Sequence, residues 1–417
     1  MKILLEAPIL TKSGYGEHSR LVHEAICLRG DVEVFINPLN WGTTTWDTPS
    51  PQVQQGIENY QRLIQYCGQN KINPEYDMQV HVGIPNEFEK KASYSVCVTA
   101  GIETDRVSPN WLVKTHQGID KIIVPSNHAR AGFVETKYEM LNKANNTQTV
   151  VNCNCEVEVV PYPVKELEVE QMDLDLETDF NFLTIAMIGP RKNLDATVRT
   201  FIEEFREDEN VGLILKTSSA RSSIMDRKRT KQQIELFLNN LGPRKCKIYL
   251  IHGDLTPEQI HSLYVHPKIN AYYTTTHGEG YGLPIFEAVY SEMPVIATDW
   301  SAHLDFLSAT HKGKKKKLFA RIDYDLKQVQ PAAIWKDLIT EESRWAWVKE
   351  TSARTQLRKV YSNYGMYKSW AKTLKENVMK THKKQEVLAK MKKVLFSEHS
   401  EDTISEIDKM FASLGGK

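Results

Sequence analysis

The sequence predicts an α/β protein in which two Rossmann-like domains follow one another along the chain. Short β-branched segments alternate with amphipathic helical segments through about residue 160, and the same alternation starts again at Asn181. This alternation is typical of parallel sheets flanked by helices. The chain has 417 residues, more than one hydrophobic core usually serves, so two cores are expected. Ligands of such sheets bind beyond the carboxyl ends of the strands, which places the site in a cleft between the domains.

The first domain is expected to comprise residues 1–164. Its predicted elements are strands at 2–7, 32–36, 95–99 and 121–124 and a helix at 17–28. An acidic segment follows at 165–179, with seven carboxylates against one lysine and without the alternation of a strand. We therefore expect residues 165–180 to link the two domains.

The second domain is expected to comprise residues 181–365. Its predicted strands are 181–188, 212–217, 246–251, 269–275 and 294–298. One helix is indicated by apolar residues at helical spacing (Leu194, Val198, Phe201, Ile202, Phe205), and another by the capping sequence Thr256-Pro257-Glu258-Gln259. Trp345, Trp347 and later apolar residues stand at mixed helical spacings, so residues 337–396 are expected to be helical throughout.

Composition argues against several classes of protein. The 53 basic and 53 acidic residues cancel, so global charge does not indicate a polyanionic partner. Six cysteines in so long a chain do not form the dense framework of a small secreted domain. The first residues contain too short an apolar run for a signal peptide, and no run of about 18 apolar residues occurs. We therefore expect a cytoplasmic protein with at most peripheral membrane contact.

The sequence offers no convincing metal site. Cys153 and Cys155 are expected to share one face of a strand, but two thiols without a second Cys/His pair make a poor zinc site. Asp173 and Asp175 could be taken for an acidic metal-binding motif, yet they fall in the expected linker and not after a strand. We expect no metal and no cofactor.

The most informative stretch is residues 276–288, which follow a predicted strand and open a helix. Pro284 suits the first helical position. Gly278, Gly280 and Gly282 allow the backbone to approach a ligand closely. The free N–H groups at the helix start, supported by the helix dipole, make a site for a phosphate.

Two glutamates lie on this stretch, eight positions apart. Glu279 could accept hydrogen bonds from sugar hydroxyls, and Glu287, one turn into the helix, could hold two ribose hydroxyls. Extended through Asp299, the whole segment resembles the donor-binding segment of the fourth glycosyltransferase family, whose fold is called GT-B. The resemblance implies that Gly280, Tyr281, Gly282 and Leu283 bind the donor together with Glu287.

A second block agrees with this resemblance. Residues 188–194 contain Pro190-Arg191-Lys192-Asn193 between the first strand and the first helix of the second domain, where a phosphate-facing loop belongs. The block is similar to a motif of many family members, which implies that Arg191 and Lys192 contact the donor diphosphate. Fixed cations there would stabilise the negative charge of the leaving group. Lys216, at the end of the next strand, is a further candidate for donor binding.

The first domain carries two weaker matches. Residues 13–20 resemble the glycine loop that closes over the donor phosphates, with Gly16 as its glycine. Residues 99–105 resemble the place where many relatives carry a histidine near the reacting carbon, and here Glu103 or Asp105 would take that position. A carboxylate that caps the next helix is an equally good interpretation.

The resemblance implies a retaining glycosyltransferase of bacterial or phage kind that needs no divalent ion. Its donor is a UDP- or GDP-sugar, and its C-terminal helices, residues 366–417, cross back to the first domain. Three readings stay open for its role. In the first, the acceptor is a cell-surface saccharide or its lipid carrier. In the second, it is a hydroxymethylated base of phage DNA. In the third, the protein binds sugar nucleotides without turnover.

Two features bear on the acceptor. The loop 40–46 carries Trp41 and Trp46, which could stack on a sugar or a base, or could pack in the core. Lysines cluster at 312–317 and at 372–393. Such runs are usually solvated faces, but they could also bind phosphates of DNA or an anionic membrane.

Overall fold

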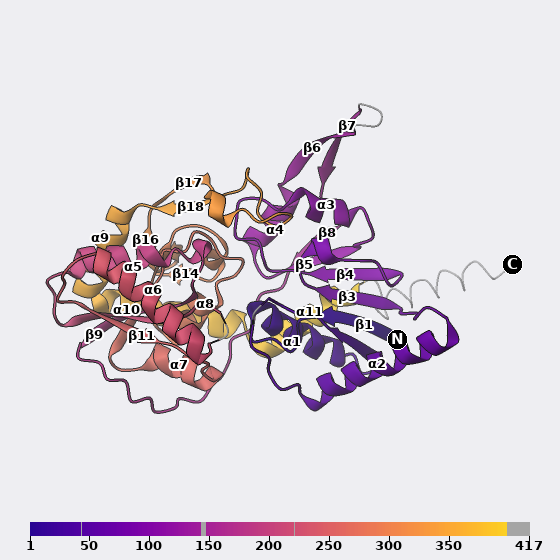
Figure 1. Ribbon diagram of the computed structural model, residues 1–417, viewed down its shortest axis with the longest axis horizontal. Helices are drawn as coiled ribbons and strands as arrows, with labels where there is room; N and C mark the ends of the chain where they lie inside the picture. The colour runs from indigo at the N-terminus through magenta and orange to yellow at the C-terminus, as the bar shows by residue number, and fades with distance from the viewer. Residues whose placement is uncertain (43, 143–146, 221, 398–417) are drawn as a thin grey trace.

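The computed structural model describes residues 1–42, 44–142, 147–220 and 222–397. Two six-stranded sheets form the centres of two lobes that lie side by side (Figure 1). Neighbouring strands within both sheets are parallel. The predicted fold class, two Rossmann-like α/β domains, is therefore confirmed.

The first sheet has the strand order β2-β1-β3-β4-β5-β8. Its strands are β1 (Lys2–Ala7), β2 (Glu33–Pro38), β3 (Met78–Val82), β4 (Tyr94–Val98), β5 (Lys121–Val124) and β8 (Glu156–Val159). The helices of this lobe are α1 (Gly14–Cys27), α2 (Pro51–Asn70), α3 (Pro109–Thr115) and α4 (Asn127–Val134). A hairpin that the sequence did not predict, β6 (Lys137–Asn142) with β7 (Thr147–Asn152), projects from the lobe (Figure 1).

The second sheet has the strand order β11-β10-β9-β12-β13-β16. Its strands are β9 (Phe180–Met187), β10 (Val211–Ser218), β11 (Lys247–Ile251), β12 (Ile269–Tyr273), β13 (Val295–Thr298) and β16 (Ala320–Ile322), and its helices include α5 (Leu194–Phe205), α6 (Ile224–Asn240), α7 (Pro257–Val265) and α8 (Leu283–Tyr290). The order turns back between β9 and β12, which makes this point the topological switch of the sheet.

Local patterns in the second lobe behave as predicted. The apolar face of α5 is buried against the sheet, including Phe201 and Phe205. At the start of α7, Thr256 Oγ1 accepts from the Gln259 N–H and Gln259 Oε1 accepts from the Thr256 N–H, both at 3.1 Å. This is the predicted capping box, which satisfies backbone donors at the helix start.

The prediction that residues 337–396 are helical throughout is wrong. A strand, β18 (Arg344–Val348), pairs with β17 (Tyr324–Gln328), and helix begins only with α9 (Glu350–Ser362). Trp345 and Trp347 stand two residues apart, which is the period of a strand. Trp345 is fully buried, and the Trp347 indole donates to the Gln328 carbonyl at 3.0 Å.

The C-terminal crossing is confirmed and belongs to a single helix. Helix α10 (Tyr364–Thr381) packs on the second core, whereas α11 (Lys384–Leu395) buries Leu388 and Met391 in the first. The turn between them is fixed where the Val164 N–H donates to the His382 carbonyl at 2.9 Å. Residues 398–417 of the predicted C-terminal segment lie outside the described residues.

Several features singled out in the sequence have clear positions. Trp41 packs on Tyr15 with ring centroids 4.2 Å apart, whereas Trp46 is 55% exposed. Lys314–Lys317 forms β15, an exposed strand paired with β14 (Ser308–His311). The expectation that Cys153 and Cys155 share a strand face is wrong, because the chain leaves β7 at Asn152 and bends before β8.

The remaining regular elements are single turns of 3-10 helix: η1 (Pro85–Glu87), η2 (Pro190–Lys192), η3 (Ala302–Asp305) and η4 (Pro331–Ala333). Residues 160–179, all described, contain no helix or strand and connect β8 to β9. Among the helices that the structure describes, none is long and apolar enough to cross a membrane.

Candidate active site

The two predicted donor loops meet at the topological switch of the second sheet. Arg191 and Lys192 lie in η2, directly after β9, and Glu279 lies in the loop between β12 and α8. Because β9 and β12 are neighbouring parallel strands, both loops leave the sheet at the same edge. This edge is where open α/β sheets bind their ligands.

Backbone and amide contacts hold the two loops together. The His277 N–H donates to the Arg191 carbonyl at 2.9 Å. Asn193 adopts a left-handed conformation with φ of 50°, and its side-chain amide donates to the Thr275 carbonyl at 3.1 Å. Asparagine tolerates this conformation better than most residues. The cations of η2 are therefore positioned by loop contacts that do not involve their side chains.

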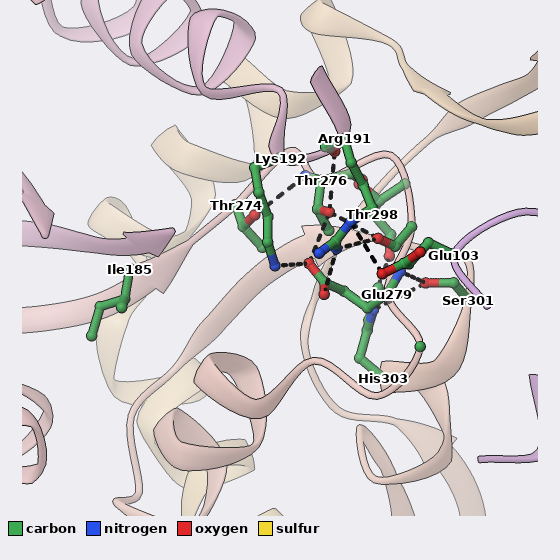
Figure 2. A network of polar contacts seen from close by, with 12 residues as sticks. Glu103, Ile185, Arg191, Lys192, Thr274, Thr276, Glu279, Thr298, Ser301 and His303 are labelled. Carbon is green, nitrogen blue, oxygen red and sulfur yellow. Dashed lines mark hydrogen bonds and ion pairs between the residues drawn. The ribbon is translucent and has the colours of Figure 1, made fainter. Parts of the chain in front are cut away.

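Four charged side chains converge at this point (Figure 2). The Arg191 guanidinium donates from Nη1 to Glu279 Oε2 at 2.8 Å and to the Gly278 carbonyl at 2.9 Å. Lys192 Nζ donates to the other oxygen of Glu279 at 2.7 Å. Glu103, from the first lobe, places Oε1 3.4 Å from Arg191 Nε. The formal charges of these two cations and two carboxylates sum to zero.

The charges of the cluster shape its pKa values. Burial alone would raise the pKa of Glu279, but the adjacent Arg191 and Lys192 cations lower it to about 2. Burial and the neighbouring Arg191 charge lower the pKa of Lys192, which the two carboxylates partly oppose. Glu279 is therefore a carboxylate throughout the physiological range, and it fixes the cations in the ligand-free protein.

Further polar residues that the sequence did not predict hold Glu279. The Thr276 hydroxyl donates to Oε1 at 2.9 Å, and the Glu279 N–H donates to Ser301 Oγ at 3.0 Å. His303 lies behind Ser301 and donates from Nε2 to the Thr298 carbonyl at 2.7 Å. Ser301 has φ of 84°, a conformation that costs about 1–3 kcal/mol for a non-glycine residue and is found mainly at functional sites.

Two glycines of the loop, Gly278 and Gly280, lie against the backbone of the first lobe. A Cβ atom on Gly278 would lie 2.1 Å from the Glu103 carbonyl oxygen, and one on Gly280 would lie 1.7 Å from that of Ala100. The Ser126 hydroxyl donates to the Gly280 carbonyl at 2.8 Å. In this structure, therefore, the two glycines let the two lobes approach backbone to backbone. Gly282, with φ of 91°, is the N-cap residue that precedes α8.

The two carboxylates predicted near the reacting carbon have different surroundings. Glu103 faces the cation cluster, whereas Asp105 accepts from the Arg344 N–H at 2.7 Å and from Arg344 Nε at 2.9 Å. Arg344 lies at the start of β18, so Asp105 joins the first lobe to that strand. The structure brings Glu103 and not Asp105 to the candidate site.

Two of the predicted donor contacts are occupied within the protein. Gly16 lies in the first turn of α1, and its Cβ position is filled by the Thr11 carbonyl oxygen, 1.9 Å away. The turn before α1 therefore requires glycine whether or not a ligand binds. Lys216 Nζ donates to the Gly253 carbonyl at 2.7 Å, which directs it to the loop after β11.

Glu287 and Leu283 open onto a cavity of about 810 Å³. The cavity lies between α1, residues 162–167, α8 and the junction of α10 with α11, and its wall includes Glu17, Arg20 and Lys165. Its volume is in the range of ligand pockets. Arg191, Lys192 and Glu279 do not line it, and residues 279–283 connect the charge cluster to the cavity wall.

Glu287 has an unusual environment for a carboxyl group. Burial raises its pKa to about 7, against the lowering effect of Lys165. The Tyr264 hydroxyl donates to its Oε2 at 3.1 Å. Tyr281, also predicted to bind the donor, packs its ring against Tyr162 and Phe306 and is 4% exposed.

Comparisons with known proteins come from structure alone. No protein-family model matches the chain, and no curated protein matches it in sequence. Sucrose-phosphate synthase from Thermosynechococcus elongatus matches with a TM-score of 0.58 and 13% identity, over 99% of this chain and 100% of that one. HepE of Anabaena, solved in complex with UDP and glucose, matches with a TM-score of 0.56 and 12% identity, over 95% of this chain and 100% of that one.

A third match, the trehalose-6-phosphate synthase OtsA, has a TM-score of 0.55 and 8% identity over 95% of this chain and 98% of that one. At such identities the likeness shows the fold, and the predicted GT-B architecture is confirmed. Among the residues described, no group of three or more His, Cys, Asp or Glu side chains is placed to hold a metal ion.

Proposed function

We propose that the protein is a retaining glycosyltransferase of the fourth family that transfers a sugar from a nucleotide diphosphate sugar to an acceptor hydroxyl. The observation that carries the proposal is the pairing of Arg191 and Lys192 with Glu279 at the switch point of the second sheet. The reaction requires cations that bind the diphosphate next to a carboxylate that binds the sugar. The GT-B fold of the neighbours supports the same activity.

Donor binding rearranges the cluster in this proposal. The ligand-free cluster is neutral, so the negative diphosphate is accommodated when Arg191 and Lys192 turn from Glu279 toward its oxygens. Glu279 then accepts hydrogen bonds from the sugar hydroxyls. Ion pairs in a closed cleft are stronger than in water, so each cation stabilises the charge that develops on the leaving group.

A retaining transfer would involve the following bond changes. The bond between the anomeric carbon and the diphosphate oxygen breaks, and the acceptor oxygen bonds to the same carbon from the same face. The acceptor proton passes to the leaving phosphate. Glu103, which lies beside Arg191, would orient the acceptor hydroxyl.

The cavity beside α8 is the proposed site of the nucleoside. Glu287 lines it and would hold the two ribose hydroxyls, while Leu283 and the start of α8 adjoin the diphosphate. The presence of UDP and glucose in the HepE structure supports UDP over GDP as the first donor to test.

The proposed acceptor is a saccharide or a lipid-linked sugar. Two structural neighbours are named as synthases of sucrose phosphate and trehalose 6-phosphate, which supports a sugar hydroxyl as the nucleophile. A hydroxymethylated base of DNA is the second candidate, because Lys314–Lys317 forms an exposed basic strand. The proposed location is the cytoplasm, where nucleotide sugars are available.

The first experiment is a panel of nucleotide sugars tested for thermal stabilisation and for turnover. A ligand that binds only the folded state raises the unfolding temperature by mass action. We expect one UDP- or GDP-sugar to stabilise the protein and to be hydrolysed slowly without an acceptor. Stabilisation without any release of the nucleotide diphosphate would instead identify a binding protein.

Activity should survive exhaustive treatment with EDTA, because Arg191, Lys192 and the α8 N–H groups supply the positive charge that a divalent ion supplies elsewhere. Initial rates with and without EDTA, each followed by added Mn²⁺, measure this. Loss of turnover that Mn²⁺ restores would contradict the metal-independent mechanism.

A further inference from the structure

Two thiols meet in the short loop that joins β7 to β8. Cys153 Sγ and Cys155 Sγ are 3.9 Å apart, and both side chains are half-buried. In a regular strand, residues two apart are separated by about 6.6 Å. Here the chain bends at Cys155, which brings the two sulfur atoms nearly into contact.

The fold holds this loop in place. The Asn154 N–H, between the two cysteines, donates to the Thr115 hydroxyl at 3.0 Å. His116 Nε2 lies 2.9 Å from the Asn152 carbonyl oxygen. Both contacts come from the C-terminal end of α3, so the folded protein maintains the approach of the thiols.

The two sulfur atoms differ in character. The hydrogen bond from the Cys155 thiol, together with a smaller effect of His116, lowers the pKa of Cys153 to about 7 against the opposing effect of burial. The same hydrogen bond and burial raise the pKa of Cys155. The exposed Cys27 differs, because burial and Glu24 raise the pKa of its thiol. A thiolate is the nucleophile in thiol chemistry, so Cys153 is the more reactive of these groups near neutral pH.

We propose that Cys153 and Cys155 form a redox-active dithiol that reacts with small disulfides such as glutathione disulfide. The Cys153 thiolate attacks one sulfur of glutathione disulfide, forms a mixed disulfide and releases one glutathione thiolate. Cys155 then loses its proton and attacks Cys153 Sγ, which releases the second glutathione. The protein loses two electrons and two protons, and one glutathione disulfide becomes two glutathione molecules.

The test uses the full chain, reduced and freed of reductant. The protein is incubated with glutathione disulfide at neutral pH, quenched with acid, alkylated and mapped by peptide mass spectrometry. We expect a Cys153–Cys155 disulfide that dithiothreitol reverses. The Cys155→Ser variant should stop at a glutathione adduct on Cys153. In Cys153→Ser, Cys155 should react at least about tenfold more slowly than Cys153 does in the wild-type chain.

Cys27 provides a control that needs no variant. In the native wild-type chain, iodoacetamide should modify Cys153 roughly tenfold faster than Cys27 at neutral pH. Equal rates, or a mixed disulfide that never resolves to the internal one in wild-type protein, would overturn the proposal. Thermal unfolding of each variant shows whether it is folded. If a variant is not folded, the ratio of Cys153 to Cys27 alkylation in the wild-type chain decides whether the proposal holds.

Discussion

Nη1 of Arg191 lies 2.8 Å from Oε2 of Glu279, although 88 residues separate them in sequence. The two residues follow neighbouring strands of one sheet, so the pair exists before any ligand arrives. Lys192 occupies the second oxygen of the same carboxylate, and Glu103 approaches from the other lobe. The Glu279 carboxylate therefore holds the two proposed catalytic cations, and it must release them when the donor binds.

Replacing Arg191 with alanine should lower turnover by roughly two to three orders of magnitude, because it removes one fixed charge from the leaving diphosphate. Steady-state kinetics with the donor found by the panel measures the change. The matched control is Arg199→Ala on α5, whose guanidinium pairs with Glu350 on α9. It should retain turnover within about twofold. Near-normal turnover of the Arg191 variant would remove this residue from the mechanism.

Glu279→Gln should lower the free energy of unfolding by about 3 kcal/mol at neutral pH, because two partly buried cations lose the buried carboxylate that they share. The pKa of Glu279 in the folded protein is about 2, below the ordinary 4.5. Its stabilising effect is therefore present above about pH 4.5 and is lost as the pH falls toward 2. Urea unfolding at several pH values should show the difference from wild type shrinking over this range.

The control for this measurement is Glu58→Gln, which removes an exposed ion pair with Arg62 on α2. Such pairs contribute less than about 1 kcal/mol. If the free energy of unfolding falls by the same small amount in both variants at every pH, the Glu279 carboxylate does not hold the two cations in the protein in solution.

The donor Michaelis constant should rise as the pH falls through 7. Glu287 must be ionised to accept hydrogen bonds from two ribose hydroxyls, and burial raises its pKa to about 7. One pH unit below this value, about a tenth of the molecules carry the carboxylate, so the constant should increase about tenfold. Glu287→Gln should have a raised constant that does not vary with pH. A wild-type constant that is flat between about pH 6 and 8 would contradict the assignment.

The same carboxyl group should affect stability with the opposite sign to Glu279. Its pKa in the folded protein is above the ordinary 4.5, so the unfolded chain releases its proton first. Stability is therefore lost as the pH rises from about 4.5 through 7. Glu287→Gln should unfold at a higher temperature than wild type above about pH 7, and at nearly the same temperature near pH 4.

The sequence predicted the local parts of the site because their signals are local. Glycines, a proline and a glutamate pair within residues 276–288 indicate a loop and a helix start, and adjacent cations mark η2. The strand β18 was missed because its Trp345 and Trp347 precede a long helical region and were assigned to it. Tyr281 was assigned to the donor, but its ring lies in the core.

The parts that could not be predicted depend on contacts between distant segments. Asp105 and Arg344 are 239 residues apart, and nothing in residues 99–105 shows which of the two carboxylates meets a partner outside the cleft. Ser301 and His303 support Glu279 from the turn after β13, where only the φ of Ser301 reveals a special role. Lys216 contacts a backbone carbonyl, which any sequence would supply.

The exposed strand Lys314–Lys317 allows the DNA acceptor to be tested directly. All four lysines are exposed, and Lys317 also pairs with Asp299 at 2.6 Å. Binding to duplex DNA releases condensed counterions, so its affinity falls steeply as the salt concentration rises, whereas the binding of a neutral saccharide does not. If DNA is the acceptor, the protein should retard duplexes at low salt.

Replacing the four lysines with glutamine should then flatten the salt dependence by nearly one unit of slope per lost phosphate contact. The matched control replaces four exposed lysines elsewhere in the second lobe (Lys228, Lys231, Lys245, Lys327) and should leave the slope unchanged.

A DNA acceptor also requires a flipped base, because the anomeric carbon in a closed cleft cannot reach a stacked one. Hydroxymethylated duplex should gain radiolabel from the donor sugar, and unmodified duplex should not. If no duplex is bound at about 50 mM salt, where phosphate contacts are strong, the saccharide is the remaining acceptor.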